Sequence, residues 1–341
     1  MDGREMQIGI VGKSNVGKST FFCGATLASA EIASYPFTTI KANKGVAFVR
    51  GRCPHLDFNT QCVPRNAGCD NGTRMIPVEL LDVAGLVPDA WKGRGLGNQF
   101  LDDLRQAHAL VHVIDASGST DIEGNSVPLG SHDPVEDIHF LEREIALWMR
   151  GILEKGWEKA ARQAHMEGKP IEPIVHDRLT GLGVTEAQVA AAMRESKLPE
   201  NPMNWGPEEM YRLTDAIRKY AKPMIIALNK ADLADDATLQ RLAQAAGGLC
   251  VPTMAEAELA LKRAAKAKLV NYVPGGDHFD LADPSKLNAP QTKALEKIRE
   301  GVERLQGTGV QQCLEKAAYE LLDLIVVYPV EDESRLTDHD G

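Results

Sequence analysis

The sequence predicts an α/β fold in which a mostly parallel sheet is covered by helices on both faces. Short, continuously apolar runs alternate with amphipathic segments of helical length, which is typical of parallel strands buried on both sides. A glycine-rich phosphate-binding pattern follows the first apolar run and opens the first helical segment. With 341 residues, the chain is long enough for about two domains.

Each element follows from its local pattern. Runs rich in Ile, Val and Leu favour strands, whereas apolar residues three or four positions apart favour helices. The predicted strands are residues 6–11, 45–49, 77–82, 110–115, 224–228, 249–251 and 324–330. The predicted helices beside them are residues 18–28, 98–107, 236–246, 255–268, 291–305 and 311–322.

The alternation of strands and helices is interrupted between residues 133 and 220. Ile138, Leu141 and Ile145 recur there at helical spacing, and we expect this apolar stripe to serve core packing. Pro134 and Pro207 suit the first turn of a helix. We therefore expect a discontinuous sheet domain at residues 1–132 and 221–275, a helical insertion at 133–220, and a C-terminal helical segment at 276–341.

Composition and charge exclude several classes of protein. The 38 Lys and Arg against 48 Asp and Glu give a net charge of −10, so we expect no DNA binding, although a local basic patch could contact RNA. The sequence has neither a membrane-spanning apolar run nor the layout of a signal peptide. The six cysteines are scattered, which predicts a soluble cytoplasmic protein with reduced thiols.

Residues 12–19 match the phosphate-loop pattern G-x-x-x-x-G-K-[ST]. Its glycines let backbone N–H groups surround phosphates, and the following helix N-terminus adds partial positive charge. We expect Lys18 to reach the outer phosphates and the Ser19 hydroxyl to bind Mg²⁺. The expected phosphate contacts are Asn15, Val16, Gly17, Lys18, Ser19 and Thr20.

Asp82-Val83-Ala84-Gly85 follows a predicted strand. The Asp82 carboxylate suits a Mg²⁺ site reached through water, and the Gly85 N–H suits a contact with the outer phosphate. D-x-x-G is a weak signal alone, and it gains meaning from the phosphate loop before it.

Asn229-Lys230-Ala231-Asp232 ends another predicted strand and indicates guanine. The Asp232 carboxylate accepts hydrogen bonds from the N1–H and 2-amino groups of guanine, a donor pair that adenine lacks, and the Lys230 stem suits the purine face. A helix cap at Asp232 is the alternative. We expect a backbone N–H at Met254 or Ala255 to bind the guanine carbonyl oxygen.

Between the first two motifs lies Tyr-Pro-Phe-Thr-Thr at residues 35–39. We expect Thr39, in preference to Thr38, to complete the Mg²⁺ shell only when the third phosphate is bound. An ordinary turn leading into a strand is the alternative.

Together these motifs resemble the Obg family of GTPases, and most closely its YchF-related archaeal and eukaryotic branch. The likeness is carried by residues 12–20, 35–39, 82–88, 93–101, 229–232 and 328–332, and it spans nearly the whole chain. It implies a Ras-like P-loop G domain with an inserted α-helical domain, hydrolysis of GTP with Mg²⁺, and a role at the ribosome or on RNA. Some YchF-like members prefer ATP and depart from N-K-x-D, which this chain keeps.

The chain departs from the family pattern in two places. Relatives continue into a TGS domain after residues 328–332, whereas this sequence ends at Gly341, so the resemblance implies a TGS-like domain that is truncated or absent. Met254 stands where relatives have a small serine, which alters the expected base-binding loop.

Leu86 and Asn15 change the expected mechanism. Leu86 stands where Ras-type enzymes place a water-positioning glutamine, which predicts a slow intrinsic rate. Asn15 resembles the asparagine of K⁺-stimulated GTPases and either binds K⁺ beside the phosphates or only stabilises the loop. Arg94 and Gln99 either contribute to GTP hydrolysis or lie on a solvated surface. The expected catalytic residues are Lys18, Thr39, Gly85 and Asn15.

A separate group of potential metal ligands lies between two predicted strands. It consists of Cys53, His55, Cys62 and Cys69. The residue types suit a tetrahedral Zn²⁺ site, but the spacing is not a standard finger pattern. We therefore favour a reduced loop with unrelated roles over zinc.

Two functions from different classes remain open. One is a GTP-hydrolysing switch that acts on ribosomes or RNA. The other is a nucleotide-gated module whose helical insertion binds a protein and whose hydrolysis is incidental. An ATP-preferring, YchF-like ATPase is a further alternative.

Overall fold

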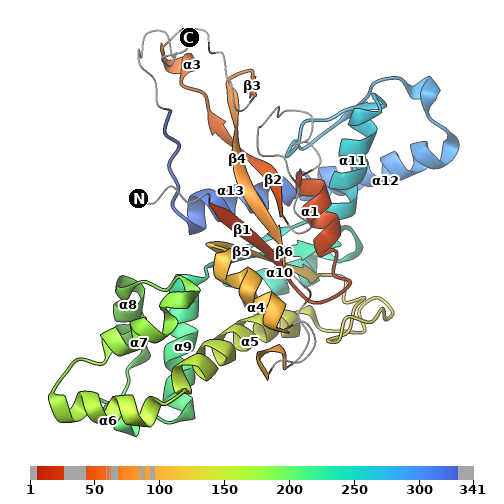
Figure 1. Cartoon of the computed structure of the whole chain (residues 1–341). Helices are drawn as coiled ribbons and strands as arrows, with labels where there is room; N and C mark the ends of the chain where they lie inside the picture. The colour runs from red at the N-terminus through yellow and green to blue at the C-terminus, as the bar shows by residue number, and fades with distance from the viewer. Residues whose placement is uncertain are drawn as a thin grey trace.

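A computed structural model describes residues 6–26, 44–58, 60, 62, 68–83, 85, 89–92 and 97–328. A seven-stranded sheet with the order β2-β4-β1-β5-β6-β7, and with β3 beside β4, forms its centre (Figure 1). The strands are β1 (Gln7–Val11), β2 (Lys44–Arg52), β3 (Cys69–Asp70), β4 (Thr73–Asp82), β5 (Ala109–Asp115), β6 (Met224–Asn229) and β7 (Cys250–Pro252). All neighbouring pairs from β4 to β7 are parallel, and β2 and β3 run antiparallel to β4.

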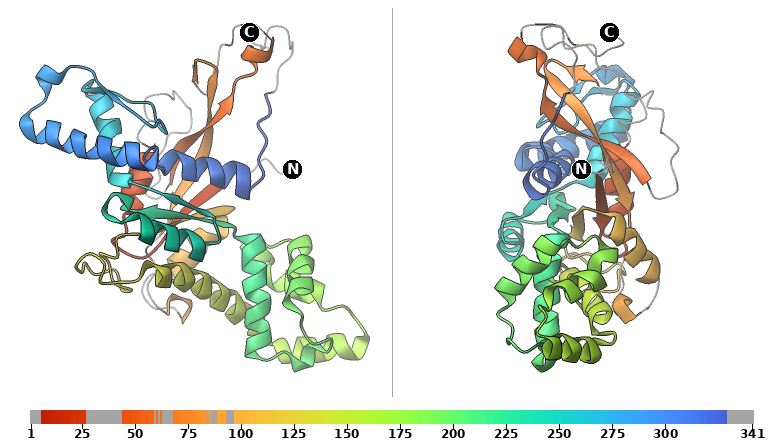
Figure 2. Two further views of the ribbon diagram at one scale, coloured as in Figure 1. Left: turned by 180° about the vertical axis from the view of Figure 1, so that it is seen from behind. Right: turned by 60° about the vertical axis from the view of Figure 1, so that its left-hand side comes forward.

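Helices cover both faces of this sheet (Figure 2). On one face Phe100 and Leu104 of α4 (Gly97–Gln106) pack with Leu141 of α5 (Pro134–Glu154). On the other, Phe21 of α1 (Lys18–Thr26) and Leu314 of α13 (Val310–Lys316) complete the core. Every residue of β5 is buried, which is why its sequence is apolar except for His112 and Asp115. The predicted fold class is confirmed.

The chain between β5 and β6 is helical. Its helices after α5 are α6 (Trp157–Glu167), α7 (Glu172–Leu179), α8 (Glu186–Ser196) and α9 (Pro207–Ala221). Asp133 caps α5 by accepting the Val135 N–H, and the rings of Trp157 and Trp205 stack with centroids 5.2 Å apart. These helices share one hydrophobic cluster with the α4 face of the sheet, and α6, α7 and α8 extend away from it (Figure 1).

The C-terminal segment returns to the sheet. After α10 (Asp236–Ala245) and α11 (Ala255–Lys266), a two-stranded sheet of β8 (Val270–Asn271) and β9 (Asp280–Leu281) precedes α12 (Ala289–Leu305) and α13. The strand predicted at residues 324–330 is wrong over its described part, because residues 324–328 carry no strand pairing. Ile325 and Val327 are exposed while Val326 between them is half-buried, so this apolar run belongs to a segment that is not paired in a sheet.

Within the residues that the model describes, no helix has the length and apolar character that crossing a membrane requires.

Candidate nucleotide-binding site

The sheet register brings the predicted motifs to one edge. Ile10 of β1 lies opposite Asp82 of β4, and Asp115 of β5 lies opposite Asn229 of β6. Because these strands are parallel, the loops that follow them leave from the same edge. We call this edge, with those loops, the nucleotide edge.

Two glycines give the phosphate loop its shape. Gly12 and Gly17 have φ angles of 147° and 98°, which L side chains rarely adopt. A Cβ on Gly12 would lie 2.3 Å from the Val113 carbonyl oxygen, and a Cβ on Gly17 would lie 2.3 Å from Asn229 Nδ2. The loop therefore packs directly on the neighbouring strand ends.

The structure brings Lys18, Ser19, Asp82 and Gly85 together. Lys18 Nζ donates to the Lys13 carbonyl oxygen at 2.7 Å. Burial lowers the pKa of Lys18, and the nearby charge of Asp82 acts in the opposite direction. Burial also raises the pKa of Asp82, while the charge of Lys18 and a hydrogen bond from the Ser19 hydroxyl act to lower it. A Cβ added to Gly85 would lie 3.3 Å from Lys18 Nζ, so little room separates this turn from the lysine.

Asn229 joins the phosphate loop to the predicted base-binding loops. Its side chain is buried, with Nδ2 donating to the Val16 carbonyl oxygen at 2.8 Å and Oδ1 accepting the Ala255 N–H at 3.0 Å. One amide thus bridges two loops that lie 239 positions apart in sequence, from Val16 to Ala255.

Lys230 is held by a buried carboxylate that sequence reasoning missed. Lys230 has a φ of 58°, and its Nζ lies 2.7 Å from Asp115 Oδ2. Burial acts to raise the pKa of the fully buried Asp115, yet hydrogen bonds from Lys230, Ser117, Thr120 and Ser119 lower it to about 2. The available signal was an aspartate that ends an apolar strand and precedes several hydroxyl residues.

The loops predicted to bind the base include the exposed carboxylate of Asp232. Asp232 lies in a short 3₁₀ turn, Ala231–Leu233, and is exposed. The Met254 N–H donates to the Thr308 carbonyl oxygen at 2.8 Å and the Ala255 N–H to Asn229. Both amides expected to bind the guanine oxygen therefore have protein partners here, whereas the Asp232 side chain is exposed.

The C-terminal segment supports these loops from behind, which the sequence did not indicate. The Arg304 guanidinium of α12 donates to the carbonyl oxygens of Ala231 and Ala234. A Cβ on Gly309 would lie 2.0 Å from the Pro252 carbonyl oxygen, so the segment packs tightly behind β7.

The loop after β5 lies against the phosphate loop. Buried Lys13 donates to the Thr120 carbonyl oxygen and pairs with Asp137, both at 2.8 Å. Asn15 Nδ2 donates to the Gly124 carbonyl oxygen at 2.8 Å. This contact uses Nδ2, whereas Oδ1 is the atom that the expected K⁺ ion would require, so both expected roles of Asn15 stay predictions.

Several predicted residues cannot be placed. Thr38, Thr39, Leu86 and Arg94 lie outside the residues that the structure describes, as does the side chain of Gln99.

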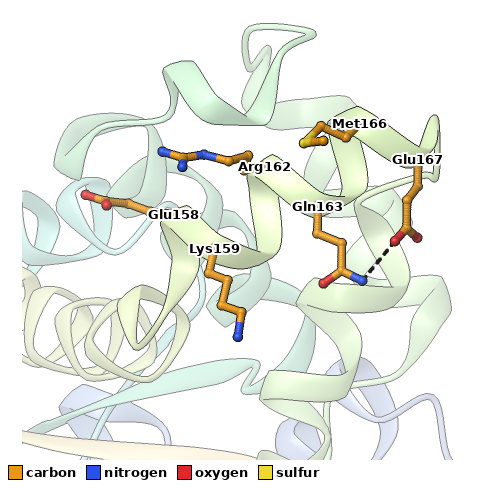
Figure 3. Close-up of a pocket in the computed structure, with 6 residues that line it drawn as sticks. All are labelled: Glu158, Lys159, Arg162, Gln163, Met166 and Glu167. Carbon is orange, nitrogen blue, oxygen red and sulfur yellow. Dashed lines mark hydrogen bonds between the residues drawn. The ribbon is translucent and has the colours of Figure 1, made fainter.

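Two other features lie away from the nucleotide edge. The hollow in Figure 3 is lined by residues of α6 alone, including the largely exposed Met166, and so brings no separate elements together.

By contrast, the potential metal ligands predicted between two strands do lie close together. The ligand atoms of Cys53, His55, Cys62 and Cys69 all lie within 4.8 Å of one another.

Comparison with known families agrees with this arrangement. The family described as "Obg-like GTPase YGR210-like, G4 motif-containing domain" matches residues 227–332. The family described as "50S ribosome-binding GTPase" matches residues 7–142. The two matches cover the Asn229 loop and the phosphate loop, respectively.

Relatives extend the likeness along the chain. A GTP-binding protein of Methanocaldococcus jannaschii is 48% identical over 98% of this chain and 84% of its own length. A GTP-binding protein of Schizosaccharomyces pombe is 37% identical over 97% of this chain and 83% of its own length. A protein named ribosome-binding ATPase YchF, from Haemophilus ducreyi, is 39% identical over 46% of this chain and 40% of its own length.

Solved structures show the same architecture. A GTP binding protein from Pyrococcus horikoshii OT3 has a TM-score of 0.75 and 40% identity, covering 97% of this chain and 84% of that one. The Schizosaccharomyces pombe YchF GTPase, with a TM-score of 0.52 and 20% identity over 95% of this chain and 78% of that one, shares the fold. The chain therefore belongs to the Obg-like GTP-binding proteins, in the YchF-related archaeal and eukaryotic branch.

Proposed function

We propose that this protein binds GTP with Mg²⁺ and hydrolyses it to GDP and phosphate. The observation that carries the proposal is the bridge made by Asn229, which bonds to Val16 in the phosphate loop and to Ala255 in the base-binding loops. One nucleotide spans a phosphate site and a base site, so the two sites must be held at a constant separation. The two hydrogen bonds of the Asn229 side chain would hold them at that separation.

The donor set at Ser19 and Asp82 fits Mg²⁺, which prefers hard oxygen ligands. The Ser19 hydroxyl and the half-buried Asp82 carboxylate are hydrogen-bonded to each other beside Lys18. Bound Mg²⁺ would neutralise charge on the outer phosphates. Thr39 would complete its shell only in the triphosphate state.

We assign the transfer step to positioning by the protein's own groups. Lys18 Nζ, now on the Lys13 carbonyl oxygen, would move to the outer phosphate oxygens. The Gly85 N–H would hold the third phosphate in line for attack by water. Asn15 Oδ1 would bind the K⁺ ion in K⁺-stimulated turnover while Nδ2 keeps its contact with Gly124, so equal rates in K⁺ and Na⁺ would assign Asn15 to the loop contact alone.

The cellular role we propose is a ribosome-associated switch. It rests on the names of a matching family, "50S ribosome-binding GTPase", and of a relative, "Ribosome-binding ATPase YchF". Co-sedimentation with ribosomal particles that differs between GTP and GDP would support it. A protein complex insensitive to RNase and to nucleotide would instead favour the protein-binding module.

The decisive experiment is a titration of GTP, GDP and ATP in Mg²⁺ with wild-type protein, Asp232→Ala and Asp236→Ala. Asp232→Ala removes an acceptor of two charge-assisted hydrogen bonds, so we expect a loss of GTP affinity of about 100-fold or more with ATP affinity unchanged. The neighbouring exposed Asp236 is the matched control. Tight ATP binding with weak GTP binding in the wild type would assign the protein to the ATP-preferring alternative. A separate phosphate-release assay tests hydrolysis, and no release of phosphate from GTP would contradict that part of the proposal.

A further inference from the structure

Four potential metal ligands converge at the far end of the β2–β4 pair, where both strands extend beyond the rest of the sheet (Figure 1). Cys53 follows β2, His55 opens the short helix α3 (His55–Phe58), and Cys69 begins β3. Cys62 joins them from between α3 and β3. We call Cys53, α3, Cys62 and β3 the hairpin tip.

Three of the distances among the four ligand atoms are close to those of a tetrahedral site, and all four atoms lie within 4.8 Å of one another. Cys62 Sγ lies 3.6 Å from Cys53 Sγ and 3.2 Å from His55 Nδ1, and Cys69 Sγ lies 3.6 Å from the same nitrogen. Zn–S and Zn–N bonds of about 2.3 and 2.0 Å at tetrahedral angles place ligand atoms about 3.5–3.8 Å apart. The observed distances need shifts of only a few tenths of an ångström.

The sulfur separation differs from that of a disulfide. Bonded sulfurs lie about 2.05 Å apart, against 3.6 Å for Cys53 and Cys62. A disulfide would also leave the third thiol and the imidazole without a shared partner. Three thiolates and one imidazole form a standard Cys₃His set for structural zinc.

Among the described residues of the hairpin tip, the large apolar side chains are half exposed. Leu56 and Phe58 of α3 are each 50% exposed, α3 has four residues and β3 has two. The Cys53 N–H donates to the Gly72 carbonyl oxygen at 2.8 Å, and Cys53 is fully buried. Small units without an apolar core commonly depend on a metal.

We propose that Cys53, His55, Cys62 and Cys69 bind one structural Zn²⁺ ion, which ties α3 and β3 to the ends of β2 and β4. The ligands are Sγ of the three cysteines and Nδ1 of the histidine. Binding releases the thiol protons, because thiolates are the ligands. All four positions are filled by protein, so the site is closed and structural rather than catalytic.

Metal analysis of the purified full chain by plasma mass spectrometry tests this directly. We expect about one zinc per wild-type chain, the stoichiometry of a closed four-ligand site, and loss of that zinc in Cys62→Ser and His55→Ala. Cys23→Ser is the matched control, because it removes an exposed thiol of α1 away from the hairpin tip and should keep the full zinc content. Far-UV circular dichroism of each variant reports whether the rest of the chain remains folded.

Cobalt provides a second readout. The metal-free protein with Co²⁺ should show tetrahedral ligand-field bands and thiolate charge-transfer absorption, both lost in Cys62→Ser. No zinc as purified combined with no uptake of Zn²⁺ or Co²⁺ by reduced protein would overturn the proposal, as would stoichiometric iron or a native Cys53–Cys62 disulfide. None of these outcomes depends on GTP binding, so the zinc site and the proposed function can fail separately.

Discussion

The two ends of strand β4 are organised by different means. At its carboxyl end, Asp82 joins a nucleotide edge assembled from distant parts of the chain, where buried hydrogen bonds link loops to one another. At its amino end lies the hairpin tip, whose ligands come from a short stretch of sequence. Ten residues of β4, at about 3.3 Å each, separate the ends by roughly 30 Å.

This difference has a consequence for stability. The nucleotide edge is formed by packing and hydrogen bonds that exist without a ligand, so its geometry is preorganised. The hairpin tip has a minimal core, so its order should depend on the four ligands. Changes at the first end should affect the whole fold, and changes at the second should remain local.

The largest effect should come from Asp115→Asn, which breaks the buried pair with Lys230. Loss of one partner of a buried ion pair typically costs about 3–5 kcal/mol, and we expect about 3 kcal/mol in urea unfolding at pH 7. Asp133→Asn is the matched control. It removes an exposed pair with Arg241 but keeps a capping side chain, so it should cost less than about 1 kcal/mol. Equal losses in the two variants would contradict the importance of burial.

A smaller effect should follow acidification, through His112 in the centre of β5. Burial, then Lys18 and Lys13, lower the pKa of His112 from 6.5 to about 3. Because the folded-state pKa lies below the unfolded value, stability is intact above pH 6.5 and falls as the pH drops toward 3. Between pH 6.5 and 4.5 this loss should be about 2–3 kcal/mol.

Urea unfolding of wild type and His112→Leu across that pH range measures the contribution. The variant cannot take up this proton, so its stability should fall less steeply. Parallel pH profiles would mean that His112 is protonated at no extra cost in the folded state.

The smallest effect should be that of zinc loss on the nucleotide edge. In Cys62→Ser, we expect faster hydrogen exchange at the hairpin tip and a GTP affinity within about twofold of wild type, because sites this far apart usually act independently. Hydrogen-exchange mass spectrometry and calorimetric GTP titration measure the two responses. A tenfold loss of GTP affinity would instead show that β4 couples its two ends.

Local sequence determined much of this arrangement. The largely apolar run at residues 110–115 specified a buried strand because most residues of a strand that lies between two helical layers are apolar. The phosphate-loop glycines were equally informative, because Gly12 and Gly17 adopt angles that other residues rarely tolerate. Most helix and strand identities therefore followed from sequence, with boundaries shifted by a few residues, whereas the strand predicted at residues 324–330 was wrong over its described part.

Contacts between distant segments did not follow from sequence. Asp115 is an ordinary strand end until folding brings Lys230 to it, and Arg304 is an ordinary helix residue until α12 packs behind Ala231. The zinc ligands show the same limit. Their residue types were visible, but their irregular spacing disfavoured a metal site until β2, α3 and β3 brought the four atoms within 4.8 Å.

The sequence by itself determined the parallel sheet and the phosphate loop, because period and glycine placement are local properties. Only the tertiary structure decided how these parts are held: which carboxylate orients Lys230, which segment supports the base-binding loops, and whether the cysteines meet. Those outcomes depend on the packing of segments far apart in sequence, which no local pattern encodes.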